Sequence, residues 1–406
     1  PAGLSVDIAA NMSSGLTSEG FTFTPVSTGG TGTLTYAWDF GDGNDSDEAE
    51  PTHFYAEGGT YTVSITVTDE LGNEVSIDKA DFVTATLATE EIIPAPSGEL
   101  RVATFNASLN RGNAGDLIAD LSTPDNTQAQ QVAEIIQLAN ADVILVNEFD
   151  YDEAGEAVAL FKTNYLEEGQ NGLSGVEYPF VYLAPSNTGI DSGFDLDNDG
   201  EATGRGNDAF GFGLFPGQFG MVLFSKYPIL EDQVRTFQNF LWKDMPDNLI
   251  PADWYSADEL EVFRLSSKSH WDVPVQLNGK VIHILASHPT PPVFDGAEDR
   301  NGTRNHDEIR LWADYVDPAK SSYLYDDLGV TGGLAAGESF VILGDQNADP
   351  NDGDSTNDAI DQLLGSTFVN ASFTPNSAGG AENNDGGNTQ TGDPAEDTAS
   401  FNLRAD

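Results

Sequence analysis

The hydrophobic pattern of this chain changes near residue 90, and the change divides the sequence into two parts that cannot share one fold. In residues 1–89, apolar and polar positions alternate along 21–24, 34–40 and 61–68, which is the period of half-buried β-strands. Glycine-rich turns separate these segments. This part is therefore predicted to be a small all-β sandwich.

The second part has a different pattern. Residues 90–99 are predicted to be a linker, because two prolines and a Ser-Gly pair lie between structured segments. From residue 100 onward, short buried strands alternate with amphipathic helices, which is typical of an α/β layered domain. Strands are expected at 102–105, 143–146, 222–224, 281–285 and 340–343, and helices at 126–140 and 305–316.

The net charge limits the partners of the chain. It carries 67 acidic and 16 basic side chains, a formal charge of −51, spread over both parts. Such a charge repels polyanions and anionic membranes at long range, which disfavours a general nucleic-acid coat protein but not a catalyst with a locally neutralised cleft. We interpret the excess as a solvated coat suited to salty water. Cysteine is absent, which excludes disulfides and thiolate metal sites. The sequence contains no apolar run of about 18 residues, so no membrane span is predicted.

A specific motif lies in the first part. Residues 36–43 read Tyr-Ala-Trp-Asp-Phe-Gly-Asp-Gly, followed by Pro-Thr-His-Phe-Tyr at 51–55 and a threonine- and valine-rich run at 59–69. Together they resemble a PKD-type domain, an immunoglobulin-like sandwich in which Trp38 would fill the core between the sheets. The resemblance implies a surface or substrate-spacing module of secreted proteins. An unspecialised spacer, or a carbohydrate- or surface-binding module, are the alternatives.

Polar side chains follow the buried strands of the second part. Asn106, Glu148, His288, Asp345 and Asn347 each stand at or just after the end of a predicted strand. Sheets hold residues at strand ends rigidly while the loops leave space for substrate. Glu148 is a hard oxygen ligand of the kind that suits Mg²⁺, Mn²⁺ or Ca²⁺, and a metal beside a histidine and an Asp–Asn pair suits phosphoester hydrolysis.

These strand ends also carry a family resemblance. The motifs at 104–106, 141–148, 217–228, 284–288 and 343–347 resemble, in order and spacing, the endonuclease/exonuclease/phosphatase superfamily with its deoxyribonuclease-I-like fold. The resemblance covers nearly all of residues 100–406 and implies a four-layer α-β-β-α sandwich. It also implies a divalent-metal-dependent hydrolase acting on phosphoester bonds, a nuclease or a phosphatase.

The resemblance implies a role for each matched residue. Asn106 and Glu148 would hold Mg²⁺ or Mn²⁺, and His288 would hydrogen-bond the scissile phosphate. Asp345 and Asn347 would position the attacking water and the phosphate. Asp406, in an Arg-x-Asp strand, would lie next to that pair. The family then expects a closing strand with a Ser-Asp-His, and the sequence stops before it. Either the chain is part of a longer one or the protein lacks the Asp–His dyad and is a structural relative.

Further candidates stand outside those motifs. Lys268 and His270 precede the strand expected beside that of His288, and are predicted either to contact substrate or to belong to a surface loop. Arg304, at the start of the following helix, could reach an anionic substrate. Asp195, Asp197 and Asp199 alternate before a glycine, as in a Ca²⁺-binding loop. Because position 206, where an EF-hand needs glutamate, is glycine, a structural Ca²⁺ would need Asn207 or Asp208, and a merely acidic loop is the alternative.

The sequence therefore predicts a secreted, divalent-metal-dependent phosphoesterase acting on phosphomonoesters or phosphodiesters. An extracellular nuclease on DNA or RNA is the first alternative, although the charge disfavours nucleic acid. A structural or surface-assembly protein that keeps the fold with weak catalysis is the second. Localisation outside the cell, without a membrane span, is expected for all three, and self-assembly or association with the cell surface fits the last.

Overall fold

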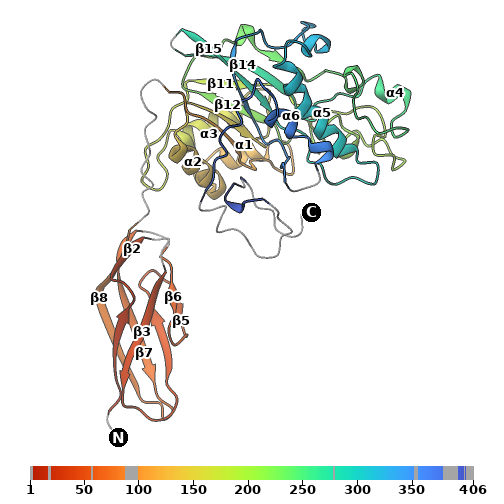
Figure 1. The fold of residues 1–406 in the computed structure, drawn as a ribbon. Coiled ribbons are helices and arrows are strands. Elements are labelled where there is room, and N and C mark those ends of the chain that lie inside the picture. The colour runs from red at the N-terminus through yellow and green to blue at the C-terminus, as the bar shows by residue number, and fades with distance from the viewer. Residues whose placement is uncertain are drawn as a thin grey trace. The chain divides into compact units, whose positions relative to one another are not determined.

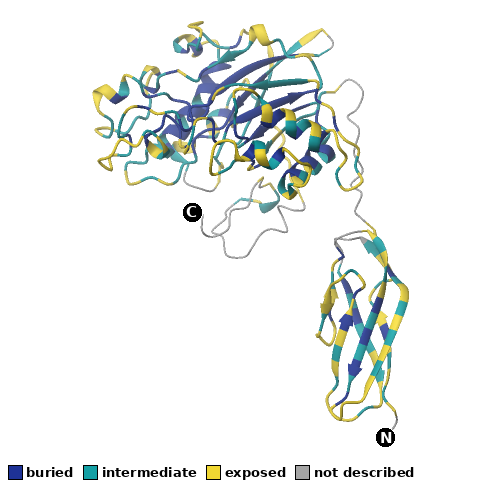
Figure 2. Ribbon diagram, turned by 180° about the vertical axis from the view of Figure 1, so that it is seen from behind, coloured by how far each residue is buried: buried dark blue, intermediate teal, exposed yellow. Residues whose placement is uncertain are grey.

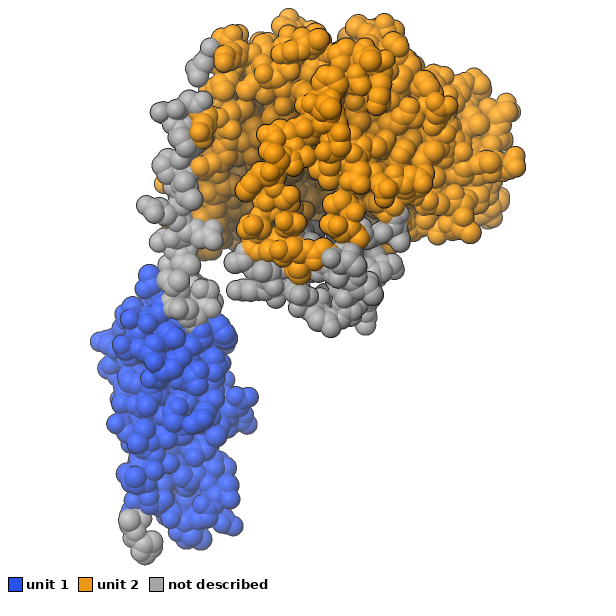
Figure 3. Space-filling view, viewed as in Figure 1, with its two compact units in different colours: residues 1–91 blue, residues 92–406 orange. Residues whose placement is uncertain are grey.

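The computed structural model describes residues 3–16, 20–55, 58–86, 99–277, 279–351, 355–377, 392–396 and 398. The chain divides into two compact units, residues 1–91 and 92–406, coloured blue and orange in Figure 3. The predicted linker stays a prediction, because residues 87–98 lie outside the described residues. Among the described residues, no helix is both long and apolar enough to cross a membrane.

The first unit is an all-β sandwich (Figure 1). Its described strands form a sheet of order β1-β3-β6 and a sheet of order β2-β8-β7-β4-β5. Neighbouring strands are antiparallel except β2 and β8, which pair in parallel. The strands are β1 (Ser5–Ala10), β2 (Ser14–Leu16), β3 (Phe21–Thr28), β4 (Thr35–Asp39), β5 (Asp45–Ser46), β6 (Thr52–His53), β7 (Gly59–Thr68) and β8 (Glu74–Thr86).

The alternation in these strands places one face of each sheet in a common core. Along β7, Val63, Ile65 and Val67 are buried while the residues between them are partly exposed. Trp38 on β4 is buried, and its ring centroid lies 6.0 Å from that of Phe23 in the opposite sheet. The prediction that Trp38 fills the space between the sheets is confirmed.

The second unit contains two four-stranded sheets among its described residues, with strand orders β11-β12-β10-β9 and β13-β14-β15-β16. In each sheet one neighbouring pair is parallel, β9 with β10 and β15 with β16, and the other described pairs are antiparallel. The strands are β9 (Val102–Asn106), β10 (Val143–Asn147), β11 (Phe180–Leu183), β12 (Met221–Ser225), β13 (Arg235–Thr236), β14 (His270–Leu277), β15 (Lys280–Ser287) and β16 (Ser339–Leu343).

Three apolar clusters hold this unit together as a four-layer α-β-β-α sandwich, as predicted. The central cluster joins the facing sides of the two sheets, for example Leu145 and Leu223 against Trp271 and Ile284. The other two clusters bury the outer faces under helices, and in Figure 2 the buried colour concentrates on the central strands. The helices are α1 (Asp116–Leu121), α2 (Thr127–Ala139), α3 (Glu156–Phe161), α4 (Ala257–Leu260), α5 (Arg300–Tyr315) and α6 (Asp361–Leu364).

The two predicted helices are present. Helix α2 begins after Asn126, whose side chain accepts a hydrogen bond from the Ala129 N–H, and it ends at Asn140 in the left-handed region. Helix α5 begins five residues before the predicted position 305. Its apolar stripe is buried as expected, but its first turn carries polar residues, which hydrophobic periodicity cannot detect.

Candidate active site

The first sheet supplies two side chains to one edge. β9 and β10 are parallel, with Asn106 opposite Asn147, so their carboxyl ends coincide. Asn106 is the last residue of β9, and Glu148 follows the last residue of β10. Glu148 has a φ of 60°, a left-handed conformation uncommon for a residue with a side chain, and such strain is concentrated at functional sites.

The second sheet supplies three further polar side chains to the candidate site, those of His288, Asp345 and Asn347. β15 and β16 are also parallel, and His288 and Asp345 follow their ends. His288 Nε2 lies 3.7 Å from Asp345 Oδ2. Asn347, also left-handed with a φ of 48°, donates from its main-chain N–H to Asp345 Oδ1 at 3.1 Å and from its side chain to the Pro289 carbonyl at 3.1 Å.

One amide joins the two groups. Asn106 Nδ2 donates to Glu148 Oε1 at 2.9 Å and to Asp345 Oδ2 at 3.0 Å. Two carboxylates from different sheets therefore converge on a single nitrogen, and both remain partly accessible to solvent. Carboxylate oxygens that converge in this way are suitable ligands for a hard divalent cation such as Mg²⁺ or Mn²⁺. The residues present therefore suit the metal that the sequence predicts.

Lys268 belongs to the same cluster. The side chain is buried and its Nζ lies 3.5 Å from the Pro289 carbonyl. Burial lowers the pKa of Lys268, while the negative charges of Glu308, Glu148 and Asp345 act in the opposite direction. A buried ammonium with one long hydrogen bond among three carboxylates can bind an anionic group that enters the site.

The imidazole of His288 is held neutral. Burial, followed by the positive charge of Lys268, places the pKa of His288 well below its usual range. Its Nδ1 is buried and has no hydrogen-bond partner among the described residues. The ring therefore has donor or acceptor capacity left for a ligand.

Two further polar residues that sequence reasoning missed lie around Glu148. Asn110 Nδ2 donates to Glu148 Oε2 at 2.9 Å. The Asp150 carboxylate accepts the main-chain N–H groups of Arg111 at 2.7 Å and of Phe219 at 3.1 Å. Burial raises the pKa of Asp150 to about 6. Asp150 lies two positions beyond Glu148 after a strand, and that position is the signal that could have identified it.

Helix α5 braces the loops of the second sheet. The Glu308 carboxylate is buried and accepts the main-chain N–H of Ser267 and of Thr290, each at 2.6 Å. Asn305 Nδ2 donates to the main-chain oxygens of Thr290, Gln346 and Asn347 at 2.8, 2.9 and 3.3 Å. The segments that carry Lys268, His288 and Asn347 are therefore attached to one turn of one helix. Glu308 lies four positions before the core residue Trp312, on the same helix face, and a charged residue there was the sequence signal that could have identified it.

Arg304 and His270 lie beside the cluster and their polar groups are engaged within the chain. The Arg304 guanidinium is buried and donates to the main-chain oxygens of Leu265, Phe210 and Arg264. His270 is the first residue of β14, with Ser266 Oγ 2.7 Å from Nδ1 and the Glu308 carbonyl 2.9 Å from Nε2. Burial lowers the pKa of His270 to about 4. In this arrangement both residues position main chain, and neither presents a described donor to a substrate.

The predicted acidic loop is assembled differently from expectation. Carboxylate oxygens of Asp195, Asp197 and Asp208 lie within 4.8 Å of one another. Asp199 is not in this group, and its side chain accepts the Glu201 N–H instead. Asp208, predicted as a completing ligand, takes the place of Asp199 because a short helical turn at Gly206–Asp208 returns the chain to the loop. Ca²⁺ binding here stays a prediction.

The predicted position of Asp406 next to Asp345 and Asn347 stays a prediction, because Asp406 lies outside the described residues.

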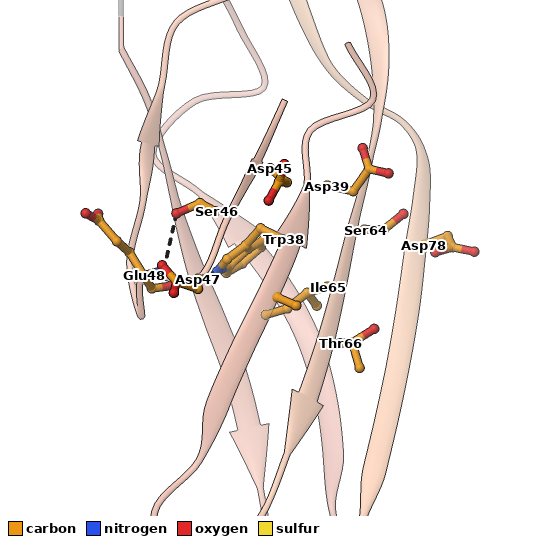
Figure 4. Close-up of a pocket in the computed structure, with 11 residues that line it drawn as sticks. Trp38, Asp39, Asp45, Ser46, Asp47, Glu48, Ser64, Ile65, Thr66 and Asp78 are labelled. Atoms are coloured by element: carbon orange, nitrogen blue, oxygen red, sulfur yellow. Dashed lines mark hydrogen bonds between the residues drawn. The ribbon is translucent and has the colours of Figure 1, made fainter. Parts of the chain in front are cut away.

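The first unit carries a surface groove of about 810 Å³ over β4, β5, β7 and β8 (Figure 4). Its lining includes the carboxylates of Asp39, Asp45 and Asp78. Trp38 is 2% exposed and its indole N–H donates to the Glu48 carbonyl at 3.0 Å, so the ring serves the core and cannot stack on a ligand. The groove therefore lacks the exposed aromatic platform expected for carbohydrate binding.

Family models match both units. The endonuclease/exonuclease/phosphatase family model matches residues 103–405, about three quarters of the chain. A PKD domain model matches residues 7–85.

Curated relatives resemble short stretches of the chain. Collagenase ColA of Bacillus cereus is 35% identical over 121 residues, which is 28% of this chain and 11% of the collagenase. Pre-pro-metalloprotease PrtV of Vibrio cholerae is 50% identical over 40 residues, 10% of this chain and 4% of the metalloprotease. The chain thus spans only a small part of the length of these relatives.

Solved structures resemble each unit. The PKD1 domain of Vibrio anguillarum Epp is 30% identical, with a TM-score of 0.18 over 21% of this chain and 94% of that domain. Sphingomyelinase C from Streptomyces griseocarneus is 17% identical, with a TM-score of 0.35 over 65% of this chain and 69% of that enzyme.

Proposed function

Because the chain belongs to the endonuclease/exonuclease/phosphatase family, we propose that its second unit is a divalent-metal-dependent phosphoesterase that cleaves its substrate by attack of water. The observation that carries the proposal is the Asn106 amide, which donates to Glu148 and Asp345 at once. That contact gathers the polar strand ends of two sheets into one cluster.

The metal would be held by Asn106 and Glu148. Carboxylate and amide oxygens suit Mg²⁺ or Mn²⁺ better than a soft ion, and the chain has no cysteine to offer a thiolate. The Asn106 oxygen accepts the Ser108 N–H at 3.1 Å, so the amide would rotate to place that oxygen on the ion. A bound divalent ion supplies positive charge that stabilises the transition state of phosphoryl transfer. Asn110, which bonds the second Glu148 oxygen, would keep the carboxylate in its orientation.

The remaining residues act on the phosphate and the water. The neutral His288 ring and the Lys268 ammonium would donate hydrogen bonds to phosphoryl oxygens, which become more negative in the transition state. Asp345, which is partly exposed and lies 3.7 Å from the neutral His288 ring, would accept a proton from the attacking water while the water oxygen bonds to phosphorus. The ester P–O bond breaks, and the leaving alkoxide takes a proton from solvent water to become the alcohol. Asn347 would orient the phosphate.

The charge of the chain favours a small substrate. Enzymes that bind long nucleic acids contact the phosphate backbone with many basic side chains. Residues 99–406 hold 51 acidic and 15 basic residues, and Arg304 is already bonded to main-chain oxygens. A phosphomonoester or a small phosphodiester fits better than DNA or RNA.

We also propose that the protein acts outside the cell. The PKD domain supports an extracellular, cell-surface or secreted location, and the acidic coat suits a saline medium. The first unit would then act as a spacer.

Hydrolysis assays test the proposed activity. p-Nitrophenyl phosphate, bis(p-nitrophenyl) phosphate and plasmid DNA are incubated with Mg²⁺, Mn²⁺ or Ca²⁺, with Asp345→Ala and His288→Ala as controls. We expect metal-dependent turnover of a small ester that chelation abolishes. Turnover no faster than the two controls for every substrate would instead support a structural relative, and preferential cleavage of plasmid would support a nuclease.

A further inference from the structure

The loop that precedes β12 exposes large apolar side chains at the edge of the first sheet. Phe212 is 55% exposed and Leu214 is 50% exposed. The ring of Phe212 lies beside that of Phe219, with centroids 6.3 Å apart and planes at 42°. Contiguous exposed apolar groups in soluble proteins mark binding surfaces, whereas isolated ones do not.

Hydrogen bonds fix the main chain of the loop near Phe219. Phe219 has a φ of 57°, a conformation that is an outlier for a bulky residue. Its main-chain N–H donates to Asp150 Oδ1 at 3.1 Å. The Gln218 side chain accepts the Leu214 N–H at 2.7 Å and donates to the Arg111 carbonyl at 2.6 Å. The exposed Phe212 ring and the partly exposed Phe219 ring therefore lie on a loop whose main chain is fixed by hydrogen bonds. Strain of this kind is concentrated at functional sites.

One end of the loop is attached to the metal-ligand side of the site. The Asp150 carboxylate that accepts the Phe219 N–H also accepts the Arg111 N–H at 2.7 Å. The residue before Arg111 is Asn110, which donates to Glu148 Oε2 at 2.9 Å. Phe219 is thus connected to Glu148 through the Asp150 carboxylate and the short segment of Asn110 and Arg111.

The other end lies against the phosphate side. Gly211 is packed so closely on Ser267 that an added Cβ would lie 1.7 Å from the Ser267 carbonyl oxygen. Ser267 directly precedes Lys268, the buried ammonium of the cluster. Phe212 and Phe219, which follow Gly211 and precede β12, therefore lie on a loop that runs from the Lys268 segment to the Glu148 segment.

From this arrangement we infer that Phe212 and Phe219 bind an apolar group carried by the substrate, so that the preferred substrate is a small phosphodiester of an apolar alcohol. The inference rests on the proposed function. The phosphate would meet Lys268 and His288 while the apolar group covers the ring pair. A polymeric polyanion does not suit the site, because the acidic coat repels it.

The test compares three p-nitrophenyl phosphodiesters whose second ester group is methyl, n-hexyl or phenyl. For the wild-type chain we expect kcat/KM for the hexyl or phenyl ester to exceed that for the methyl ester at least tenfold, because hydrophobic contacts of one to a few carbons give about that discrimination. A hexyl preference identifies an aliphatic group and a phenyl preference an aromatic one.

Phe212→Ser and Phe219→Asn should reduce that ratio toward one, and asparagine tolerates the left-handed backbone at position 219. Phe368→Ala, which removes a ring that is 47% exposed elsewhere in the unit, should leave the ratio unchanged. Circular dichroism verifies that each variant is folded. Equal kcat/KM for the three esters in the wild-type chain would overturn the inference while the proposed function stands. Absence of turnover of all three, with p-nitrophenyl phosphate still hydrolysed, would overturn the inference alone, and absence of turnover of every ester would overturn both.

Discussion

Asn106 Nδ2 lies 3.0 Å from Asp345 Oδ2, although the two residues are 239 positions apart in the chain. Asn106 ends β9 in one sheet, and Asp345 follows β16 in the other. The contact therefore forms only when the two sheets of the second unit are packed together. The candidate site is therefore complete only in the folded unit.

Glu148→Gln should abolish metal-dependent turnover. The substitution keeps the shape of the side chain but removes the charge that a hard cation requires. We expect kcat/KM to fall by about 100-fold or more and the metal concentration for half-maximal rate to rise. The assay is ester hydrolysis against Mg²⁺ concentration. Glu153→Gln, an exposed carboxylate nearby, is the matched control and should behave as the wild type.

Lys268→Met should separate activity from stability. We expect kcat/KM to fall by about 100-fold, since a charged donor to the phosphate is lost. The free energy of unfolding should change little, because the loss of attraction to neighbouring carboxylates opposes the gain from replacing a buried ammonium with an apolar chain of similar length. Urea denaturation and steady-state kinetics measure the two quantities, with Lys280→Met at an exposed position as the control. A large loss of stability would argue that Lys268 is mainly structural.

Glu308→Gln should weaken the attachment of two loops to α5. A glutamine has one carbonyl oxygen, so only one of the N–H groups of Ser267 and Thr290 keeps a good acceptor. Hydrogen bonds to charged groups contribute about 1.5–3 kcal/mol, and we expect a loss of unfolding free energy in that range. Equilibrium urea unfolding is the measurement. The exposed Glu338→Gln should change it little, and equal behaviour of the two variants would contradict the bracing role.

Stability should fall as the pH is lowered from about 6.5 to about 4, in part because of His270. Its pKa is about 4 in the folded chain, below the 6.5 of an ordinary histidine, so the unfolded chain binds more protons throughout this interval. The difference corresponds to about 3 kcal/mol. Unfolding free energies at several pH values measure it. His270→Gln should flatten the slope in that interval, and an unchanged slope would exclude His270 as its source.

The fold was predictable because its signals are local. The alternation in residues 61–68 and the stripe of Ile309 and Trp312 depend on neighbours a few positions apart, and β7 and α5 formed where these patterns lie. The start of α5 was placed too late because its first turn contains polar residues that tertiary contacts bury.

The candidate site was predictable only in part. Strand-end positions identified Asn106, Glu148 and His288, but hydrogen bonds between distant residues are not visible in a sequence. Asn110 and Glu308 were missed for that reason, and Asp199 was preferred over Asp208 because spacing cannot reveal how a loop returns. Arg304 resembles an anion-binding residue in sequence, yet its donors meet main-chain oxygens.

The bracing by α5 also has a kinetic consequence. The amide protons of Ser267 and Thr290 are in loops, where exchange with solvent deuterium is usually fast, but both bond to a buried carboxylate of a core helix. They should exchange only when α5 detaches, at rates comparable to those of the strand amides. The loops of the candidate site would therefore open through rare subglobal unfolding rather than through independent loop motion.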